Sequence, residues 1–523
     1  MEDAPLRTNL LVIGCGIAGS SAALAAADAG NEVIVVAKSA NAEASNTFYA
    51  QGGIVTLGPD DDPVVLRDDI IKAGDGLNSR EAVDILVRDG RRLVDEVLVE
   101  RLGVPFSRGA EGSLNYAREA GHSRRRILHV KDTTGMTIER AFIAALGDHP
   151  RIRLLENFTA VDLLTSPHHS KNPIAYYREP RCHGAYVLDN ASRRVRTVFA
   201  RQTILATGGC GAVFLNTSNP RDAIGAGYAM AHRAGARIVN MEYIQFHPTI
   251  LYHRDAEGFL ISETVRGEGA RLKTRDGRTF MDKYGGLKDL APRDEVARAI
   301  YEEMILTNDT NVFLDLASFT KVNIPERFPC IYKTCLQVGI DISKDPIPVV
   351  PAAHYCCGGV LVDGWGRTSL PGLYAAGETA CTGLHGANRL ASTSLLEGLI
   401  WGTRAGRDAA GQSQNPLAID ESELHEWYYP ERGEPVDPAL INQDWLTIRS
   451  TMWNYAGIVR TEKRLERAKA DLEYLRHRIE KFYKEADIDP QIVGLRHGIQ
   501  VALMITHAAL ANRTSAGAHF RVD

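Results

Sequence analysis

The amino-terminal part of the chain alternates between short apolar runs and a segment of small side chains. Residues 9–13 (Asn-Leu-Leu-Val-Ile) form a continuous apolar run typical of a buried strand. Small and apolar residues then recur at helical spacing over 20–29, Gly30-Asn31 ends that pattern, and 32–37 is again apolar. The pattern predicts one β-α-β unit of about 30 residues.

Glycines occupy the turn between the first expected strand and the helix, as Gly14-Cys-Gly16-Ile-Ala-Gly19. Gly14 allows a tight turn, Gly16 lets backbone amides approach a pyrophosphate, and Gly19 lets the helix pack against the sheet. The amino end of the helix then favours an anion. GxGxxG is a weak signal alone, but between a strand and a helix it predicts a dinucleotide site. Where an acidic residue commonly binds the ribose, the chain has Lys38-Ser39, so one of these serves or the ribose is held otherwise.

Later segments continue this fold after an interruption. Residues 202–209 and 372–378 each resemble a strand that runs into glycine, which predicts further strands of the nucleotide-binding fold. Towards the carboxyl end the pattern becomes helical, with a charged helix expected over 462–485 and a more apolar one over 492–511. We expect a nucleotide-binding domain in two parts (1–237 and 354–415), an inserted capping domain (238–353) and a helical domain (416–523).

Composition excludes several classes of protein. The 523 residues are 44 % hydrophobic and 24 % charged, which excludes disorder and fibrous repeats. A formal charge of −5 gives no broad electrostatic footprint for nucleic acid or an anionic membrane. No apolar run approaches the roughly 18 to 20 residues of a membrane helix, and the start lacks the pattern of a secretory signal. The sequence therefore predicts neither nucleic-acid binding nor membrane insertion.

The eight cysteines are scattered, with no CxxC pair and no tight disulfide spacing. This distribution predicts a reducing compartment and no structural metal. We expect a cytoplasmic protein, or a plastid one if a transit peptide has been removed.

Further motifs follow one another along the chain. In order they are Ser45-Asn-Thr-Phe-Tyr-Ala-Gln-Gly-Gly53, Ala206-Thr-Gly-Gly209, Gln245-Phe-His-Pro-Thr249, Arg266-Gly-Glu-Gly269, Leu290-Ala-Pro-Arg-Asp294, His354-Tyr-Cys-Cys-Gly-Gly359, Gly377-Glu378 and His385-Gly-Ala-Asn-Arg-Leu-Ala-Ser392. With the glycine turn, they resemble the flavoprotein family of succinate dehydrogenase, fumarate reductase and L-aspartate oxidase over essentially the whole chain. The resemblance implies an α/β fold: a Rossmann-like FAD-binding domain, an inserted α+β capping domain and a C-terminal helical domain. The implied cofactor is FAD.

Three features separate the branches of that family. Membrane-bound members link the flavin to a histidine, but this chain has Asn46 there, so the resemblance implies non-covalent FAD. The segment 118–123 resembles the aspartate oxidase pattern, in which a glutamate, here Glu119, faces the substrate amino group. The segment 513–519 also looks like a variant of that branch's terminus. All three features favour the aspartate oxidase branch.

The resemblance implies that the chain oxidises L-aspartate to iminoaspartate and passes the electrons to oxygen, giving hydrogen peroxide, or to fumarate. This would begin NAD biosynthesis, with quinolinate synthase taking the unstable product. The alternatives are a soluble fumarate reductase or succinate dehydrogenase-type flavoprotein and, from another class, a flavin-binding module without catalysis. Both a monomer and a homo-oligomer remain open.

The resemblance also implies roles for single residues. Arg293 matches the catalytic arginine, and we favour a role in orienting substrate and stabilising charge because an arginine free base is very costly at neutral pH. The expected substrate-binding residues are Glu119, His247, Ser262, Glu263, His354 and Arg389. The expected cofactor-binding residues are Gly14, Gly16, Ile17, Ala18, Gly19, Lys38, Ser45, Asn46, Thr47, Gln51, Gly52, Gly53, Ala206, Thr207, Gly208, Glu378, Ser392, Ser394 and Leu395.

Some positions depart from the family pattern or stay open. Ala226 replaces a carboxylate expected beside the ribityl chain, which predicts weaker flavin binding, and Ala516 replaces an arginine that would pair domains. Arg266 and Glu268 either form an ion pair with each other or contact substrate. We also expect the capping domain to close over the flavin and exclude water.

Overall fold

The structure is a computed structural model that describes residues 4–109, 111–119, 121–166, 168–319, 323–413, 421–430 and 433–523. Its α-helices are α1 (Ile17–Asp28), α2 (Pro63–Ala73), α3 (Arg80–Leu93), α4 (Thr134–Asp148), α5 (Ala226–Arg233), α6 (Glu263–Gly267), α7 (Arg293–Thr307), α8 (Ile324–Arg327), α9 (Pro329–Gln337), α10 (Ser394–Gln412), α11 (Pro438–Tyr455), α12 (Glu462–Glu485) and α13 (Pro490–Ala511). Its strands are β1 (Leu6–Ile13), β2 (Val33–Val36), β3 (Ile54–Val55), β4 (Tyr116–Ala117), β5 (Ile127–Leu128), β6 (Ile152–Leu155), β7 (Phe158–Ser166), β8 (Arg181–Asp189), β9 (Arg194–Leu205), β10 (Ile238–Val239), β11 (Ile244–Leu251), β12 (Arg271–Lys273), β13 (Val312–Asp315), β14 (Ile347–Cys356), β15 (Gly359–Leu361), β16 (Leu373–Ala375) and β17 (Ala380–Cys381).

A seven-stranded sheet forms the centre of the nucleotide-binding fold. Its order is β6-β2-β1-β9-β8-β7, and β16 joins the same β9. Strands β6, β2, β1, β9 and β16 are parallel, while β7, β8 and β9 form an antiparallel meander. The predicted β-α-β unit is β1, α1 and β2; β2 and residues 10–13 of β1 are buried, as their continuous apolar runs require. The α/β class is confirmed.

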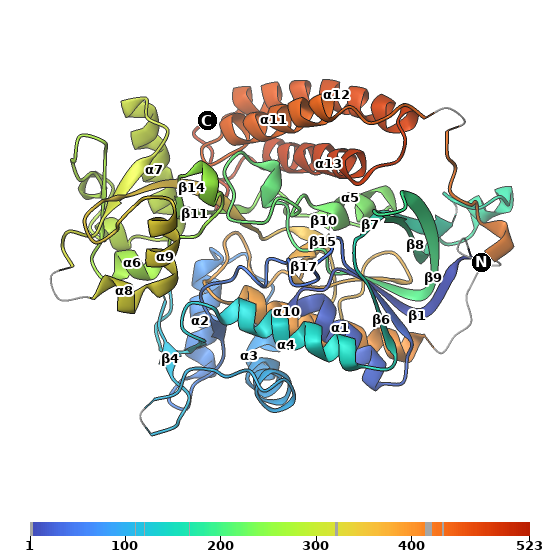
Figure 1. The fold of residues 1–523 in the computed structure, drawn as a ribbon, viewed down its shortest axis with the longest axis horizontal. Helices are drawn as coiled ribbons and strands as arrows, with labels where there is room; N and C mark the ends of the chain where they lie inside the picture. The colour runs from blue at the N-terminus through green and yellow to red at the C-terminus, as the bar shows by residue number, and fades with distance from the viewer. Residues whose placement is uncertain are drawn as a thin grey trace.

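Two helices from distant parts of the chain pack against each other beside this sheet. Helix α1 is made almost wholly of small residues, and α10 crosses it through glycines (Figure 1). A Cβ at Gly402 would lie 2.3 Å from the Ala18 carbonyl oxygen, and one at Gly406 would lie 2.3 Å from that of Ala22. Small side chains thus let the two backbones approach closely.

The inserted segment forms a separate antiparallel sheet of order β11-β14-β13-β12, with α6 to α9 around it. It lies at one end of the molecule in Figure 1, beside the nucleotide-binding fold. Strand β14 runs from Ile347 to Cys356, so the boundary expected between 353 and 354 falls inside a strand. The boundaries of the four segments stay predictions.

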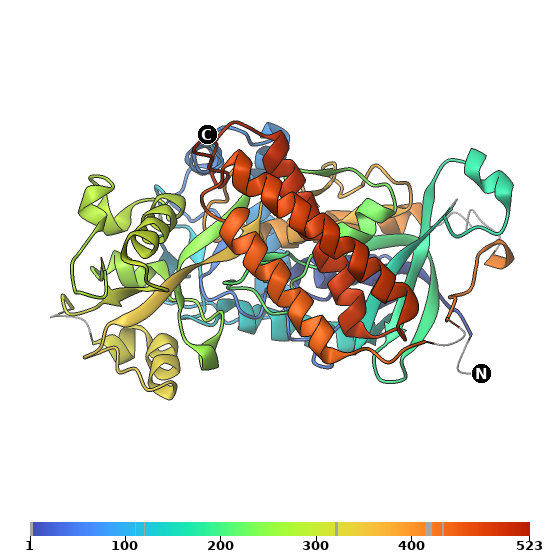
Figure 2. The same ribbon diagram turned by 90° about the horizontal axis from the view of Figure 1, so that it is seen from above.

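Three long helices, α11, α12 and α13, lie side by side across the molecule (Figure 2). Helix α12 has the range that its sequence pattern predicts, because Leu465, Leu472 and Ile479 recur on one buried face. Helix α13 begins at Pro490, with Asp489 as its cap, two residues before the predicted start. Residues 416–420, where the helical domain is expected to begin, lie outside the described residues.

The segment 421–430 packs on the meander, in a cluster that also includes Val493 of α13. Leu424 is buried with Val161 and Tyr186, and the Tyr186 hydroxyl donates to the His425 carbonyl over 2.6 Å. Within the parts of the chain that the structure describes, no helix combines the length and the apolar character needed to cross a membrane.

Candidate active site

A cavity of about 2610 Å³ extends from the glycine turn after β1 to the inserted segment. All but one of the residues predicted to bind substrate or cofactor line it. The exception is Gly19, whose Cβ would lie 2.0 Å from the Gly14 carbonyl oxygen and 3.2 Å from the Ala206 side chain. Gly19 therefore packs the helix against the sheet, and its assignment to direct cofactor contact has no support in this geometry.

The glycine turn has the form that a dinucleotide needs. Gly14 has φ +108°, and a Cβ there would lie 2.1 Å from the Ala206 carbonyl oxygen. The N-cap of α1 is Gly16, and the first turn carries no acidic side chain. The amino end of the helix faces the cavity, where its dipole favours the phosphates of a dinucleotide. These residues fit FAD.

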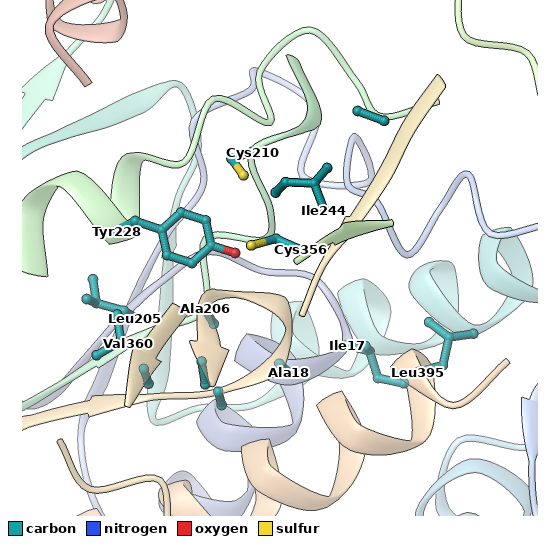
Figure 3. Close-up of a cluster of buried hydrophobic side chains, with 14 of the residues drawn as sticks. Ile17, Ala18, Leu205, Ala206, Cys210, Tyr228, Ile244, Cys356, Val360 and Leu395 are labelled. Atoms are coloured by element: carbon teal, nitrogen blue, oxygen red, sulfur yellow. The ribbon is translucent and has the colours of Figure 1, made fainter. Parts of the chain in front are cut away.

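The segment 45–47 lines the cavity beside this helix end. The Thr47 hydroxyl accepts from the Ile17 amide over 3.1 Å, and the Asn46 amide donates to Glu378 over 3.1 Å. Burial raises the pKa of Glu378 to about 7, despite donation from the Cys356 amide. Figure 3 shows Cys210, Tyr228 and Cys356 pointing toward one another in the buried cluster beside Ala206. Glu378 is thus a half-buried acceptor beside this buried cluster.

Lys38 lines the cavity at the end of β2, as predicted for the ribose side. Its ammonium group pairs with Asp222 at 2.6 Å. Ala226 is the first residue of α5 and also lines the cavity, so the small side chain stands at the position where the family pattern has a carboxylate. Ala516 packs beside Tyr243, Tyr355 and Ala387 in a small apolar cluster.

A chain of alternating charges enters the cavity from the inserted segment. Glu263 at the start of α6 pairs with Arg293 at 2.6 Å and with Arg266 at 3.3 Å. Burial alone would raise the pKa of Glu263, but the two guanidinium groups hold it below its ordinary value. Burial lowers the pKa of Arg293, yet Glu263 raises it above the usual value overall. Arg293 is therefore a protonated, paired cation and is poorly suited to act as a base.

Arg266 does not pair with Glu268, in contrast to one of the two readings of their motif. Arg266 donates to the Asp289 carbonyl over 2.6 Å, whereas Glu268 pairs with Arg327 at the surface of the segment. Arg266 pairs with Glu263 because the two residues are three positions apart in the chain, which places both on the same face of α6.

Arg389 is held by a separate set of groups. Its guanidinium donates to the Gln245 side-chain oxygen over 3.2 and 3.3 Å and to the Ser394 hydroxyl over 2.8 Å. It also lies over the Tyr355 ring, 4.5 Å from the centroid. The same Gln245 oxygen lies 3.5 Å from an Arg293 nitrogen. One amide oxygen therefore faces both arginines.

Two histidines, the buried His247 on β11 and the half-buried His354 on β14, lie next to each other. The rings of His247 and His354 lie 5.4 Å apart, and burial lowers the pKa of both well below the ordinary value. The Ser218 hydroxyl lies 2.7 Å from His354 Nδ1. Both imidazoles are thus neutral hydrogen-bonding groups. Ser262 caps α6, since its hydroxyl accepts from the Thr264 amide.

Glu119 reaches the cavity from the loop after β4. It accepts from the Ser392 hydroxyl over 2.7 Å, and its side chain lies against Gly52. Burial raises the pKa of Glu119, although the Ser392 hydroxyl and Arg293 favour the charged form. A buried carboxylate of this kind gains most from a cationic partner.

The sequence reasoning assigned no role to Gln245 or Ser218, which orient Arg389 and His354. Gln245 belongs to a motif that was recognised, so its position beside His247 was a usable signal; Ser218 belongs to none of the recognised motifs. No group of three or more His, Cys, Asp or Glu side chains arranged for a metal ion occurs among the described residues.

The chain is similar to known proteins over its full length. A family model described as an FAD binding domain matches residues 9–395, and one described as fumarate reductase flavoprotein C-term matches 446–523. L-aspartate oxidase 1 of Ralstonia nicotianae is 44 % identical over 99 % of this chain and 96 % of its own length. L-aspartate oxidase of Halobacterium salinarum is 43 % identical over 100 % of this chain and 98 % of its own.

Solved structures agree with these relatives. A quinol-fumarate reductase with menaquinol molecules superposes with a TM-score of 0.87 at 28 % identity, covering 99 % of this chain and 92 % of that chain. Mycobacterium smegmatis Sdh1 in complex with UQ1 superposes with a TM-score of 0.83 at 30 % identity, covering 99 % and 89 %. The predicted resemblance, the fold class and the FAD cofactor are confirmed. The chain belongs to the L-aspartate oxidases of the fumarate reductase and succinate dehydrogenase flavoprotein family.

Proposed function

We propose that this protein binds L-aspartate between Arg389 and Arg293 and oxidises it to iminoaspartate, passing the electrons to oxygen or fumarate. The observation that carries the proposal is the arrangement of two buried guanidinium groups (Arg266 and Arg389), the half-buried Arg293 and a separate half-buried carboxylate, Glu119, in a single cavity. Bound FAD would supply the hydride acceptor. The chain's own residues supply binding, orientation and charge.

The charge of the site matches an amino dicarboxylate. Arg266, Arg293 and Arg389 carry three positive charges, and Glu119 and Glu263 carry two negative charges when ionised. The difference of one positive charge balances the one net negative charge of aspartate. A dicarboxylate without an amine carries one more negative charge, and the raised pKa of Glu119 lets this residue take up a proton when such a ligand binds. The same site can therefore accept aspartate and fumarate.

Each end of the substrate has its own partners. Arg389 and neutral His354 suit one carboxylate, because a guanidinium offers a planar fork and an imidazole adds one donor. His247 and the Ser262 hydroxyl face the cavity from the inserted segment and suit the other carboxylate. Arg293 lies between these groups and stabilises charge near the reacting carbon.

Oxidation of an amine requires that the nitrogen lose a proton as the Cα hydride leaves. Glu119 pairs with the ammonium group, and its raised pKa makes it a suitable acceptor for that proton. A fumarate reductase without amine chemistry has no need of a carboxylate at this position, which is why we favour amino-acid oxidation over the reductase alternative. The implied place of the reaction is the start of NAD biosynthesis, with quinolinate synthase using the product.

The first test is an anaerobic titration of the FAD-loaded protein with L-aspartate, D-aspartate and succinate, followed by the oxidised flavin absorbance. We expect L-aspartate alone to reduce the flavin, and admission of air to restore the absorbance with release of peroxide. Reduction by succinate alone would replace this function with the dehydrogenase one. Recovery with fumarate but not with air would limit the acceptor to fumarate.

The second test is Glu119→Gln. The variant keeps the volume and removes the charge, so the KM for L-aspartate should rise by about tenfold or more, while fumarate reduction by a reduced dye should change by less than about threefold. Fumarate affinity of the unchanged protein should fall as pH rises, because Glu119 must then be protonated, and the variant should lose this dependence. Equal losses with both substrates would contradict the role of Glu119 in amine recognition.

A further inference from the structure

We propose that His122 is a positioning residue that holds the Ser392 hydroxyl on Glu119 and so sets the geometry of amine recognition. This inference rests on the proposed function of Glu119. His122 is buried and belongs to none of the groups assigned above to substrate or cofactor. It acts on Glu119 through a hydrogen bond to the neighbouring turn.

Ser392 has a backbone conformation that few residues other than glycine adopt. Its φ is +57°, in the left-handed region. Its hydroxyl donates to Glu119 over 2.7 Å and lies 3.4 Å from the Gly53 amide, which donates to it. Its carbonyl accepts from the Val55 amide over 3.1 Å. A strained turn of this kind persists only when its surroundings fix it from several sides.

His122 supplies one of these constraints from the loop that carries Glu119. Its Nε2 lies 2.9 Å from the carbonyl oxygen of Ala391, the residue before Ser392. A carbonyl can only accept, so Nε2 carries the proton and the imidazole donates. Burial lowers the pKa of His122 to about 4, which keeps the ring neutral at ordinary pH. The tautomer and the direction of the hydrogen bond are thereby fixed.

The two hydrogen bonds connect the same two segments. Glu119 and His122 lie on one loop, where the His122 amide donates to the Glu119 carbonyl over 3.2 Å. Ala391 and Ser392 are neighbours on the turn before α10. The bond from His122 to Ala391 and the bond from Ser392 to Glu119 therefore both join the loop to the turn. Loss of the first leaves the second as the remaining one of these two links between the loop and the turn.

The far side of the loop is anchored independently. The Ser123 amide and hydroxyl both donate to Asp69, over 2.8 and 2.6 Å. Arg126, fully buried, pairs with Asp69 and Asp61 at 2.8 Å each. Because these contacts do not involve the His122 ring, removing its donor should leave the loop in place and release the turn.

The test compares His122→Phe, which keeps an aromatic ring without the donor, with His122→Gln, whose amide nitrogen can donate in place of Nε2. For His122→Phe we expect the KM for L-aspartate to rise by about tenfold and fumarate reduction to change by less than about threefold. His122→Gln should restore the KM to within about threefold of the unchanged protein. FAD absorbance and thermal unfolding of each purified variant establish that it is folded and loaded.

A double variant identifies the route of the effect. In a Ser392→Ala background the hydroxyl is already absent, so adding His122→Phe should raise the KM for L-aspartate by less than about twofold. A full further loss in that background, or equal losses with aspartate and fumarate, would overturn the inference. If Glu119→Gln is selective for aspartate and His122→Phe is not, the inference alone fails. If Glu119→Gln is itself not selective, the proposed role of Glu119 fails and the inference falls with it.

Discussion

At the scale of single residues, the site works by holding charges out of water and close to opposite charges. Glu263 is shared by Arg266 and Arg293, so each buried ion has a partner. Arg389 has no carboxylate at ion-pair distance among the described contacts and instead relies on amide and hydroxyl oxygens. It is therefore the guanidinium with most to gain from a substrate carboxylate.

Replacing Arg293 by Leu tests the charge role. Turnover of L-aspartate should fall by about a thousandfold or more, because the positive charge beside the reacting carbon is lost. The absorbance of bound FAD should stay unchanged. Arg275→Ala, which removes an exposed arginine of the same inserted segment, is the matched control and should retain near-normal turnover. Loss of flavin from Arg293→Leu would instead assign this residue to the cofactor.

Glu139 illustrates a buried titratable group outside the reaction. It lies on α4, fully buried, and burial raises its pKa to about 8, although the Ser45 hydroxyl lowers it in part. The folded protein then binds a proton that the unfolded chain releases near its ordinary pKa. Stability from this group is therefore present at low pH and is lost as pH rises through about 8.

Replacing Glu139 by Gln should remove that pH dependence. The free energy of unfolding of the variant, measured by urea denaturation, should exceed that of the unchanged protein at about pH 9.5 by about 1 to 3 kcal/mol, and the two should be closer at about pH 5. A variant that is equally destabilised at both pH values would show that the carboxyl group contributes packing only.

At the scale of elements, small residues decide how the helices meet. Helix α1 carries almost no large side chain, and α10 meets it through Gly402 and Gly406. The start of α10 is instead set by backbone conformation. The helix begins at Ser394 because Ser392, two residues earlier, takes a left-handed conformation. The cavity is thus lined both by Ser392 in the turn before the helix and by Ser394 and Leu395 in its first turn.

Replacing Gly402 by Ala places a Cβ against the Ala18 backbone. We expect the free energy of unfolding to fall by about 2 to 4 kcal/mol and FAD binding to weaken, because α1 carries the phosphate-binding turn. Gly411→Ala on the same helix is the control: nothing lies within 4 Å of its Cβ, so alanine should stabilise the helix by up to about 1 kcal/mol. Similar losses in the two variants would contradict a specific close approach at Gly402.

At the scale of the whole molecule, the long helices are fixed to the rest of the chain by buried polar contacts. Arg460 is fully buried between α11 and α12. It donates to the Glu242 carbonyl over 2.7 Å and to His519 Nδ1 over 2.6 Å. One side chain thereby joins the segment before β11 to the carboxyl end. This contact lies close to Ala516, which stands where the family pattern has an arginine.

Arg460→Ala should lower the free energy of unfolding by about 2 to 4 kcal/mol, since it leaves a buried carbonyl and an imidazole without their donor. Arg476→Ala on the exposed face of α12 should change it by less than about 0.5 kcal/mol. Urea denaturation with flavin fluorescence as a second probe would measure both variants. Equal stability of the two would show that the attachment does not depend on Arg460.

Much of this protein follows from its sequence because many of its determinants are local. The glycine turn, the apolar strands on either side of it and the stripe of Leu465, Leu472 and Ile479 are short-range patterns, and they predicted β1, α1, β2 and α12. Motifs spaced along the chain identified the family, and all but one of the site residues that they predicted line the cavity. In these segments, the residue types within a few positions of one another are enough to predict the local structure and the kind of ligand.

Tertiary structure decided the partners across distance. No local pattern shows that Gln245 faces two arginines or that Arg266 prefers Glu263 to Glu268. Nor does any local pattern show that His122 reaches Ala391, which is 269 residues away in the chain. Such contacts depend on how strands, turns and helices from separate segments come together. Burial, which shifts the pKa of each carboxylate and imidazole in the cavity, exists only once that packing is complete.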